Sequence, residues 1–504
     1  MKSKTDLPEL IRAMSKSEKR YFTLDAQKSG RQNSRYLELF QAINDMADYD
    51  EDQLRDKFGS NLPSDKAYLY DAILRSMRDY RSSRSYSARI KEMILDAKYL
   101  YERGLYDQCE ERLAEAKKLA LELDDQLALL EINKENRTLA FGARKDYSEK
   151  IRQLIYEKDN NIKALTEEFK LLDLGYELLL EWKKNLNPRH PERQKLLADL
   201  SAEGFPDDRY IPESAYAKRL YFQCAGMYAQ LLGNRELTTE YYLKTFNWWE
   251  INPKQKNEEF TKYIADVSNL LNAYSIQGKY EFLPDILDKL DKEDTQNYHE
   301  KAAVFQRSSI YRLMYFINIS PLHGVDPVIR KIEKGLGLYQ INTPGRLVIL
   351  FNVAVLLFIN ERFEEVRLWV KKIRDLKTTL RQDIQKGAQT INLIAGYESL
   401  DPEEFDKNIR STRRFFQKLN LEKSSFEFNI MEHFRKLAGA SIYDSKNVME
   451  EIRQLVLSFQ QQDKASIPLG LDELILHYVD ARQHKGSIID SLKKQRNAVR
   501  NQTP

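Results

Sequence analysis

One helical-hairpin pattern returns along this chain of 504 residues, and it constrains the fold more than any other feature. In residues 99–125, Gly104 and Tyr106 mark a turn. Small or apolar residues then fall 5, 9 and 12 positions after the glycine: Cys109, Leu113 and Ala116. Offsets of this kind lie on one face of a helix. The segment therefore predicts a helix, a tight turn and a second helix that buries this face.

Three further segments repeat the pattern: 227–253, 272–294 and 355–373. Their turn position is held by two glycines and a glutamate: Gly233, Gly278 and Glu361. In the last two segments all face positions are apolar: Leu283, Leu287, Leu290, Val366, Val370 and Ile373. The first segment has one tyrosine between two threonines there: Thr238, Tyr242 and Thr245. A face shared by four segments predicts that each packs against its neighbours in the same way.

The glycine–x–tyrosine turn and the offsets after it resemble the tetratricopeptide repeat family, whose units are antiparallel helix pairs of about 34 residues. The segment at 227–253 departs from the family pattern at Thr238, where the family prefers a small residue, and at Pro253, which comes later than the family's closing proline. The resemblance implies an all-α solenoid of stacked helix pairs with a concave surface that binds peptides or helices of other proteins. About 9–12 pairs fit between residues 90 and 490.

The composition agrees with an all-α chain. Glycine (18) and proline (14) are scarce, and 31% of the residues are charged. A chain of strands would need more turn residues. The first 85 or so residues contain short amphipathic helices without the repeated pattern. We therefore predict three parts: an N-terminal helical head at 1–85, a tetratricopeptide-like array at 86–490 and a basic frayed tail at 491–504.

Charge, cysteines and apolar runs narrow the class of protein further. The net charge of +3 does not indicate a globally basic nucleic-acid binder. Two distant cysteines, Cys109 and Cys224, exclude a disulfide framework and favour a reducing compartment. The most apolar run, 347–359, makes a helix of about 20 Å, shorter than the ~30 Å hydrocarbon core. With no apolar run typical of a signal peptide near the N-terminus, we expect a cytoplasmic protein without membrane contact, and a buried core helix at 347–359.

A stripe of arginines at the end of the predicted head raises the question of nucleic-acid binding. Arg75, Arg78, Arg81 and Arg84 are spaced three residues apart and share one side of a helix. Such a stripe can neutralise phosphates, and nearby tyrosines can stack on bases. Residues 50–80 also allow a helix-turn-helix whose second helix, 65–80, would enter a major groove. The simpler interpretation, which we favour, is the solvated face of a helix whose arginines pair with acidic neighbours.

Motifs for catalysis, cofactors or metals are absent from the sequence. It contains no HExxH, GxSxG or GxxxxGK[ST] and no Gly-rich turn between a strand and a helix. His477, Asp480 and His484 share a helix face, but the two histidines are about 10 Å apart along the axis, too far to bind one metal ion. We interpret this segment as a surface helix and both cysteines as small buried residues. We therefore predict no catalytic, cofactor or metal site.

An aromatic cluster at 239–250 offers a possible contact with a partner. It contains Tyr242, Phe246, Trp248 and Trp249. Adjacent residues of a helix point about 100° apart. The two tryptophans therefore cannot face the same layer of the core, and we expect one of them to be exposed as a partner contact.

Three hypotheses for function remain, from different classes. The first is a non-enzymatic scaffold or adaptor that binds a peptide or helix of another protein. The second is a transcriptional or nucleic-acid-linked regulator whose head binds nucleic acid while the array acts as a sensor. An exposed arginine stripe favours this hypothesis, whereas arginines paired with acids argue against it. The third, an enzyme, requires a deep pocket with clustered carboxylates or histidines.

Overall fold

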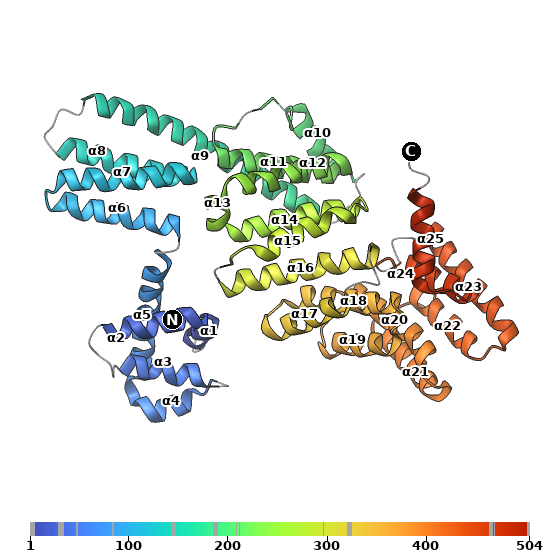
Figure 1. Cartoon of the computed structure of the whole chain (residues 1–504). Coiled ribbons are helices and arrows are strands. Elements are labelled where there is room, and N and C mark those ends of the chain that lie inside the picture. Colours follow the sequence, from blue (N-terminus) through green and yellow to red (C-terminus); the bar gives the residue numbers. More distant parts are fainter. Residues whose placement is uncertain are drawn as a thin grey trace. The chain divides into compact units, whose positions relative to one another are not determined.

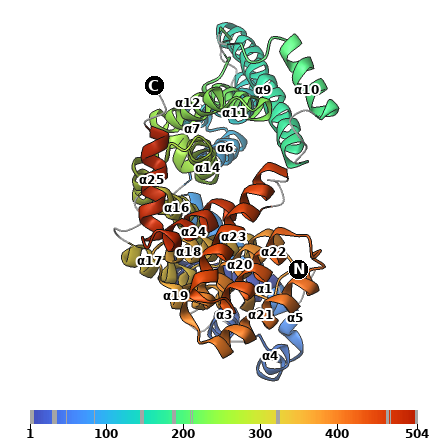
Figure 2. The same ribbon diagram turned by 90° about the vertical axis from the view of Figure 1, so that its right-hand side faces the viewer.

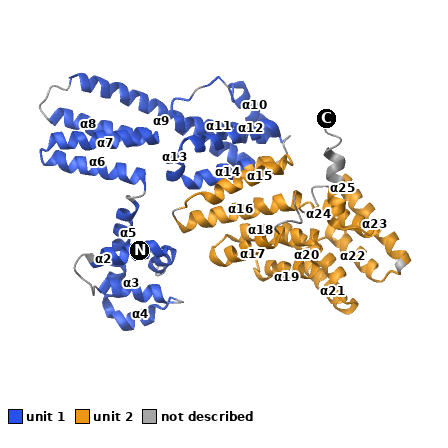
Figure 3. Ribbon diagram, viewed as in Figure 1, with its two compact units in different colours: residues 1–270 blue, residues 271–504 orange. Residues whose placement is uncertain are grey.

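The computed structural model describes residues 6–28, 35–46, 49–82, 85–142, 148–184, 190–207, 209–210, 212–295, 297–319, 325–462, 467 and 469–500. In these ranges every regular element is a helix, and no strand occurs. The chain forms two compact units, residues 1–270 and 271–504 (Figure 3). The boundary between the units falls within helix α14 (Phe260–Ile276).

The first unit begins with a small group of helices: α1 (Asp6–Ala13), α2 (Lys16–Lys28), α3 (Arg35–Asp45), α4 (Glu51–Phe58) and α5 (Leu62–Ser82). Apolar faces from these helices share one core whose members run from Leu7 to Ile73. A 3₁₀ turn (Gly59–Asn61) joins α4 to α5, and the Asp50 side chain caps α4 by accepting hydrogen bonds from two backbone N–H groups. A second core begins at Ile90. The domain boundary at residue 85 stays a prediction.

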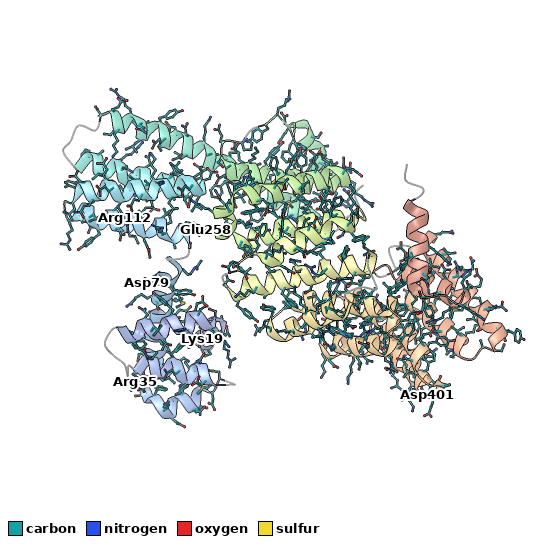
Figure 4. All side chains as sticks on the ribbon, viewed as in Figure 1. Lys19, Arg35, Asp79, Arg112, Glu258 and Asp401 are labelled. Carbon is teal, nitrogen blue, oxygen red and sulfur yellow. The ribbon has the colours of Figure 1, made fainter. Side chains whose placement is uncertain are left out.

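The rest of the first unit continues in hairpins (Figure 1): α6 (Tyr86–Glu102), α7 (Tyr106–Leu123), α8 (Gln126–Gly142), α9 (Ser148–Lys183), α10 (Pro191–Ala202), α11 (Ala215–Leu232), α12 (Arg235–Ile251), α13 (Pro253–Glu258) and α14. Neighbours in sequence pack side by side, as α6 does with α7 and α11 with α12. Glu258, labelled in Figure 4, accepts hydrogen bonds from the Ser85 hydroxyl (2.6 Å) and from the Tyr86 N–H (2.9 Å). This carboxylate ties the start of α6 to the end of α13.

The second unit has the same style of packing and contains α15 (Leu283–Lys292), α16 (Tyr298–Asn318), α17 (Val325–Leu338), α18 (Thr343–Ile359), α19 (Phe363–Asp375), α20 (Gln382–Ser399), α21 (Pro402–Lys418), α22 (Phe426–Ala438), α23 (Ile442–Gln462), α24 (Leu471–Gln483) and α25 (Ile488–Arg500). The predicted core helix at 347–359 is confirmed, because ten of these thirteen residues of α18 are buried and the other three are half-buried. The segment predicted as a frayed tail is helical as far as Arg500, because Ile488 and Ile489 are buried and anchor α25; residues 501–504 lie outside the described ranges.

All four predicted turns have the same geometry. The turn residue adopts a left-handed conformation, with φ of +74° at Gly104, +77° at Gly233, +72° at Gly278 and +55° at Glu361. The N–H of the following residue donates to the carbonyl five positions earlier, with N···O distances of 2.9–3.0 Å. Every face position after these turns is at most 6% exposed. The predicted hairpins and their buried faces are therefore confirmed.

Candidate functional site

The hollow with the clearest chemical character lies in the second unit, where α19 and α21 both pack on α20. Its volume is about 730 Å³. Residues of all three helices line it: Glu364, Arg367, Leu368, Lys371, Arg374, Asn392, Ser399, Leu400, Glu404, Lys407 and Asn408. We call this hollow the α19–α21 groove.

Helix periodicity places the basic side chains of α19 in this groove. Arg367, Lys371 and Arg374 fall at i, i+4 and i+7, and so share one side of the helix. The adjoining side, about 100° around the helix, carries buried residues of the core, among them Val366 and Val370. The core therefore fixes the direction in which the three cations point.

The α21 side of the groove is fixed by a helix cap and by a close approach of two helices. The Asp401 side chain accepts a hydrogen bond of 2.9 Å from the Glu404 N–H and so starts α21 (Figure 4). At Gly396 of α20, a Cβ atom would lie only 2.3 Å from Asn408 Nδ2. The glycine thus lets the Asn408 side chain lie directly against α20.

The electrostatics of the groove are cationic. Four cations and two carboxylates line it. Lys407 pairs with Glu403 at 2.8 Å on the exposed side of α21. Within the described part of the chain, Arg367, Lys371 and Arg374 have no carboxylate within ion-pair distance. A cationic surface without its own counter-charges attracts an anionic ligand.

Two amides and two leucines give the groove further contacts. Asn392 Nδ2 donates to Asn408 Oδ1 at 3.2 Å, and Asn408 Nδ2 donates to the Asn392 carbonyl at 3.4 Å. An amide side chain offers both donors and acceptors and can therefore bind a peptide backbone. Leu368 is 62% exposed at the edge, and Leu400 is half-buried. The groove thus combines charge, amides and apolar surface.

A second hollow of about 580 Å³ lies among α23, α24 and α25 and contains the histidines singled out in the sequence. His477, Asp480 and His484 all line it, but His477 is only 5% exposed, so the expected surface position of His477 is wrong. The cause is α25, whose Ser491 hydroxyl lies 2.9 Å from His477 Nδ1. Within the described residues, no group of three or more His, Cys, Asp or Glu side chains is arranged to hold a metal ion.

The Ser491 hydroxyl lies between two side chains of α24, 2.9 Å from His477 Nδ1 and 3.4 Å from Asp480 Oδ2. Its single proton can be donated to only one of them at a time. Asp480 is also paired with Arg453. Burial raises the pKa of the Cys224 thiol to about 12, so this cysteine is not an activated nucleophile.

The expectation of an exposed tryptophan in the aromatic cluster is wrong. Tyr242, Phe246, Trp248 and Trp249 are all at most 4% exposed. The two tryptophans do point in different directions, with ring planes 83° apart, but both directions are covered. Trp248 meets Tyr216 of α11, and Trp249 meets Tyr263 of α14. None of the four rings is available to a partner on this surface, so we do not propose the cluster as a contact.

The arginine stripe lies at the end of α5. Arg75, Arg78 and Arg81 are exposed, and no carboxylate of the described ranges lies within ion-pair distance of them. Arg84 lies outside the described residues. The solvated face that we favoured is therefore present at these three arginines, but their expected pairing with acids is not. The nearby tyrosine, Tyr80, has its ring 5.0 Å from the ring of Tyr21 on α2.

Two features were missed from the sequence: a pair of carboxylates with raised pKa values and the α19–α21 groove. Burial raises the pKa of Glu168 on α9 to about 7, and burial also raises the pKa of Asp124 at the end of α7. No sequence signal separates these carboxylates from the many solvated ones. The α19–α21 groove had a weak signal in the i, i+4, i+7 spacing of its cations, a pattern common on solvated helices.

Comparisons with protein-family models, curated proteins and solved structures give no match to this chain. The resemblance to tetratricopeptide repeats therefore rests on the four turns and the faces that follow them. None of the helices in the described ranges has the length and apolar character needed to cross a membrane.

Proposed function

We propose that this chain is a non-enzymatic protein-interaction scaffold, built from tetratricopeptide-like helix pairs, that binds a peptide or helix of a partner protein. The four matching turns and their buried faces support the repeat architecture. Both cysteines are free and buried, which agrees with a reducing compartment such as the cytoplasm.

The observation that carries the proposal is the α19–α21 groove. Its three unpaired cations favour an acidic ligand, its amides can bind a peptide backbone, and its leucines can contact apolar side chains. This combination fits an acidic protein segment that also carries apolar residues. A bare phosphate chain would use the cations and leave the leucines without partners.

The test is binding of a fluorescent acidic peptide that contains aspartate, glutamate and leucine. We expect the triple variant Arg367→Glu/Lys371→Glu/Arg374→Glu to lose at least about tenfold in affinity, because it reverses three contacts. The matched control, Arg75→Glu/Arg78→Glu/Arg81→Glu, makes the same change of charge in the head and should bind like the wild type. Equal affinity of all three proteins, or no binding of the wild type, would refute the groove as the site.

A second function, nucleic-acid binding by the head, is favoured by the exposure of the arginine stripe. The structure of α5 argues for phosphate contacts rather than base reading. A helix-turn-helix reads bases with the first residues of its second helix. In α5 this end carries Asp65, paired with Arg35 at 2.8 Å, and Lys66, which is 3% exposed.

A gel-shift assay with duplex DNA and single-stranded RNA over a salt series tests this second function. Binding through the stripe predicts a steep loss of affinity with salt, and a loss of binding in the variant Arg75→Glu/Arg78→Glu/Arg81→Glu. The groove variant then serves as the control. No shift by the wild type at about 0.15 M salt would exclude the regulator hypothesis.

A further inference from the structure

Helix α9 carries an apolar stripe that is exposed in the described part of its unit. Its buried side packs on α8 and α11 through residues such as Leu154 and Leu178. In Figure 1 α9 begins along the upper edge of its unit, and in Figure 2 α10 lies beside it. Six apolar residues are 39–64% exposed on the other side: Ile151, Ile155, Ile162, Phe169, Tyr176 and Leu180. A row of exposed apolar residues along one side of a helix is a candidate interaction surface.

The spacing of this α9 stripe shows what kind of partner fits it. Successive members are 4, 7, 7, 7 and 4 residues apart. A seven-residue repeat keeps one side of a helix facing a second helix in a coiled coil. These spacings read the same from either end of the helix, so the stripe is symmetric about a midpoint between Leu165 and Thr166. An antiparallel copy of α9 would therefore present apolar residues at matching levels.

Charged residues on the face of the stripe and on its flank obey the same symmetry. Lys158 and Asp173 lie equally far on either side of the midpoint, so each would meet the other's counterpart in an antiparallel pair. On one flank, Arg152 would lie within two positions of the partner's Glu177, about 3 Å along the axis. A parallel pair would instead place Lys158 and Asp173, which lie on the facing side, each beside its own copy. Charge complementarity thus favours a second copy in the antiparallel orientation.

We propose that two copies of this chain associate through α9, antiparallel, about a two-fold axis that passes between Leu165 and Thr166. Ile162 then packs against the partner's Phe169, and Ile155 against the partner's Tyr176. Such an interface is self-complementary, as a two-fold dimer requires. The proposal uses only α9 and does not depend on peptide binding by the second unit.

The oligomeric state of the full chain tests the surface. Light scattering coupled to size exclusion, from about 1 to about 100 µM, should show a dimer for the wild type and a monomer for Ile162→Lys. The matched control is Leu127→Lys on α8, which changes another exposed apolar residue (60%) and should remain dimeric. Circular dichroism confirms that both variants are folded. A monomeric wild type, or a dimer that survives Ile162→Lys, would overturn the proposal.

Cross-linking tests the orientation. In the antiparallel dimer, residue 166 lies beside its own copy, whereas the two copies of residue 155 are about 32 Å apart along the axis. A short bis-maleimide should therefore link Thr166→Cys into covalent dimers and leave Ile155→Cys unlinked. The native Cys109 and Cys224 are buried and do not compete. Equal cross-linking at both positions would indicate a parallel pair and contradict the proposed axis.

Exchange of charges tests the register. Arg152→Glu places two acids together at each end of the interface and should weaken the dimer about tenfold, as should Glu177→Arg. The double variant Arg152→Glu/Glu177→Arg restores opposite charges and should recover the wild-type affinity. If the double variant dimerises as weakly as the single variants, these residues do not face each other.

Discussion

At the scale of the residue, Glu168 is the carboxylate with the most unusual environment. It is 9% exposed and accepts a hydrogen bond of 2.6 Å from the Ser214 hydroxyl. Its pKa is raised to about 7, mainly by burial; the Ser214 hydrogen bond lowers it, and the nearby carboxylates Asp124, Asp125 and Glu167 contribute to the rise. Since Ser214 also caps α11, this carboxyl group joins α9 to the start of α11.

The raised pKa predicts how stability depends on pH. Between pH 4.5 and about 7 the folded chain binds more protons at Glu168 than the unfolded chain does, so the free energy of unfolding falls as pH rises through this range. Glu168→Gln should raise the free energy of unfolding by about 1–2 kcal/mol at pH 8 and leave it nearly unchanged at pH 5. Urea unfolding at both pH values measures this, with Glu149→Gln, a change at a 90% exposed side chain, as the control. An equal effect of Glu168→Gln at both pH values would contradict the predicted role of its raised pKa.

Left-handed backbone positions give a second test at this scale. Gly278 has φ +72°, and no atom lies within 4 Å of the place that a Cβ would occupy, so Gly278→Ala changes only the backbone strain and should cost about 1 kcal/mol. Lys485 has φ +53° and is exposed, so Lys485→Gly should stabilise the chain by about 0.5–1 kcal/mol. Thermal unfolding of the two variants should therefore shift in opposite directions. A shift in the same direction would show that side-chain contacts dominate.

At the scale of the element, one buried ion pair joins three helices. Arg219 of α11 donates to Asp266 of α14 at 2.7 and 3.0 Å, and Trp249 of α12 donates to the same carboxylate at 2.8 Å. Both charged side chains are at most 2% exposed. Buried pairs of this kind contribute little net stability, but the loss of one partner leaves an uncompensated charge.

The variant Arg219→Met should therefore destabilise the first unit by about 3–5 kcal/mol, since it leaves the buried Asp266 carboxylate without its counter-charge. The double variant Arg219→Met/Asp266→Asn removes that charge and keeps an acceptor for Trp249, so it should recover about 2 kcal/mol of the loss. Denaturant unfolding of Arg219→Met, Asp266→Asn and the double variant measures how strongly the two residues are coupled, as a double-mutant cycle. Additive losses would show that the two residues act independently.

Sequence patterns predicted the turns between helices correctly but not which helix faces other helices cover. The turns at Gly104 and Gly278 depend on local backbone geometry, which the glycine and the offsets encode, and the structure confirms them. The exposure of Trp248 and Trp249 depends on α11 and α14, and local periodicity cannot tell which directions other helices cover. The α19–α21 groove was missed for the same reason, because its residues come together only when two helices pack on a third.

At the scale of the whole molecule, the two proposals concern different units. The α19–α21 groove belongs to residues 271–504, and the α9 stripe belongs to residues 1–270. Each can therefore be disabled without touching the other. The chemistry of the two surfaces also differs, since the groove is cationic whereas the stripe is apolar and carries charges of both signs.

A dimer that carries two grooves should bind a multivalent partner more tightly than a single segment, because the second contact becomes intramolecular. On a surface that displays acidic peptides densely, the wild type should dissociate about 10–100 times more slowly than Ile162→Lys. In solution, where one peptide meets one groove, the two proteins should have the same affinity. The groove variant should fail in both assays. If Ile162→Lys dissociates from the dense surface as slowly as the wild type, then association through α9 does not strengthen binding to a multivalent partner, and the scaffold works as a single chain.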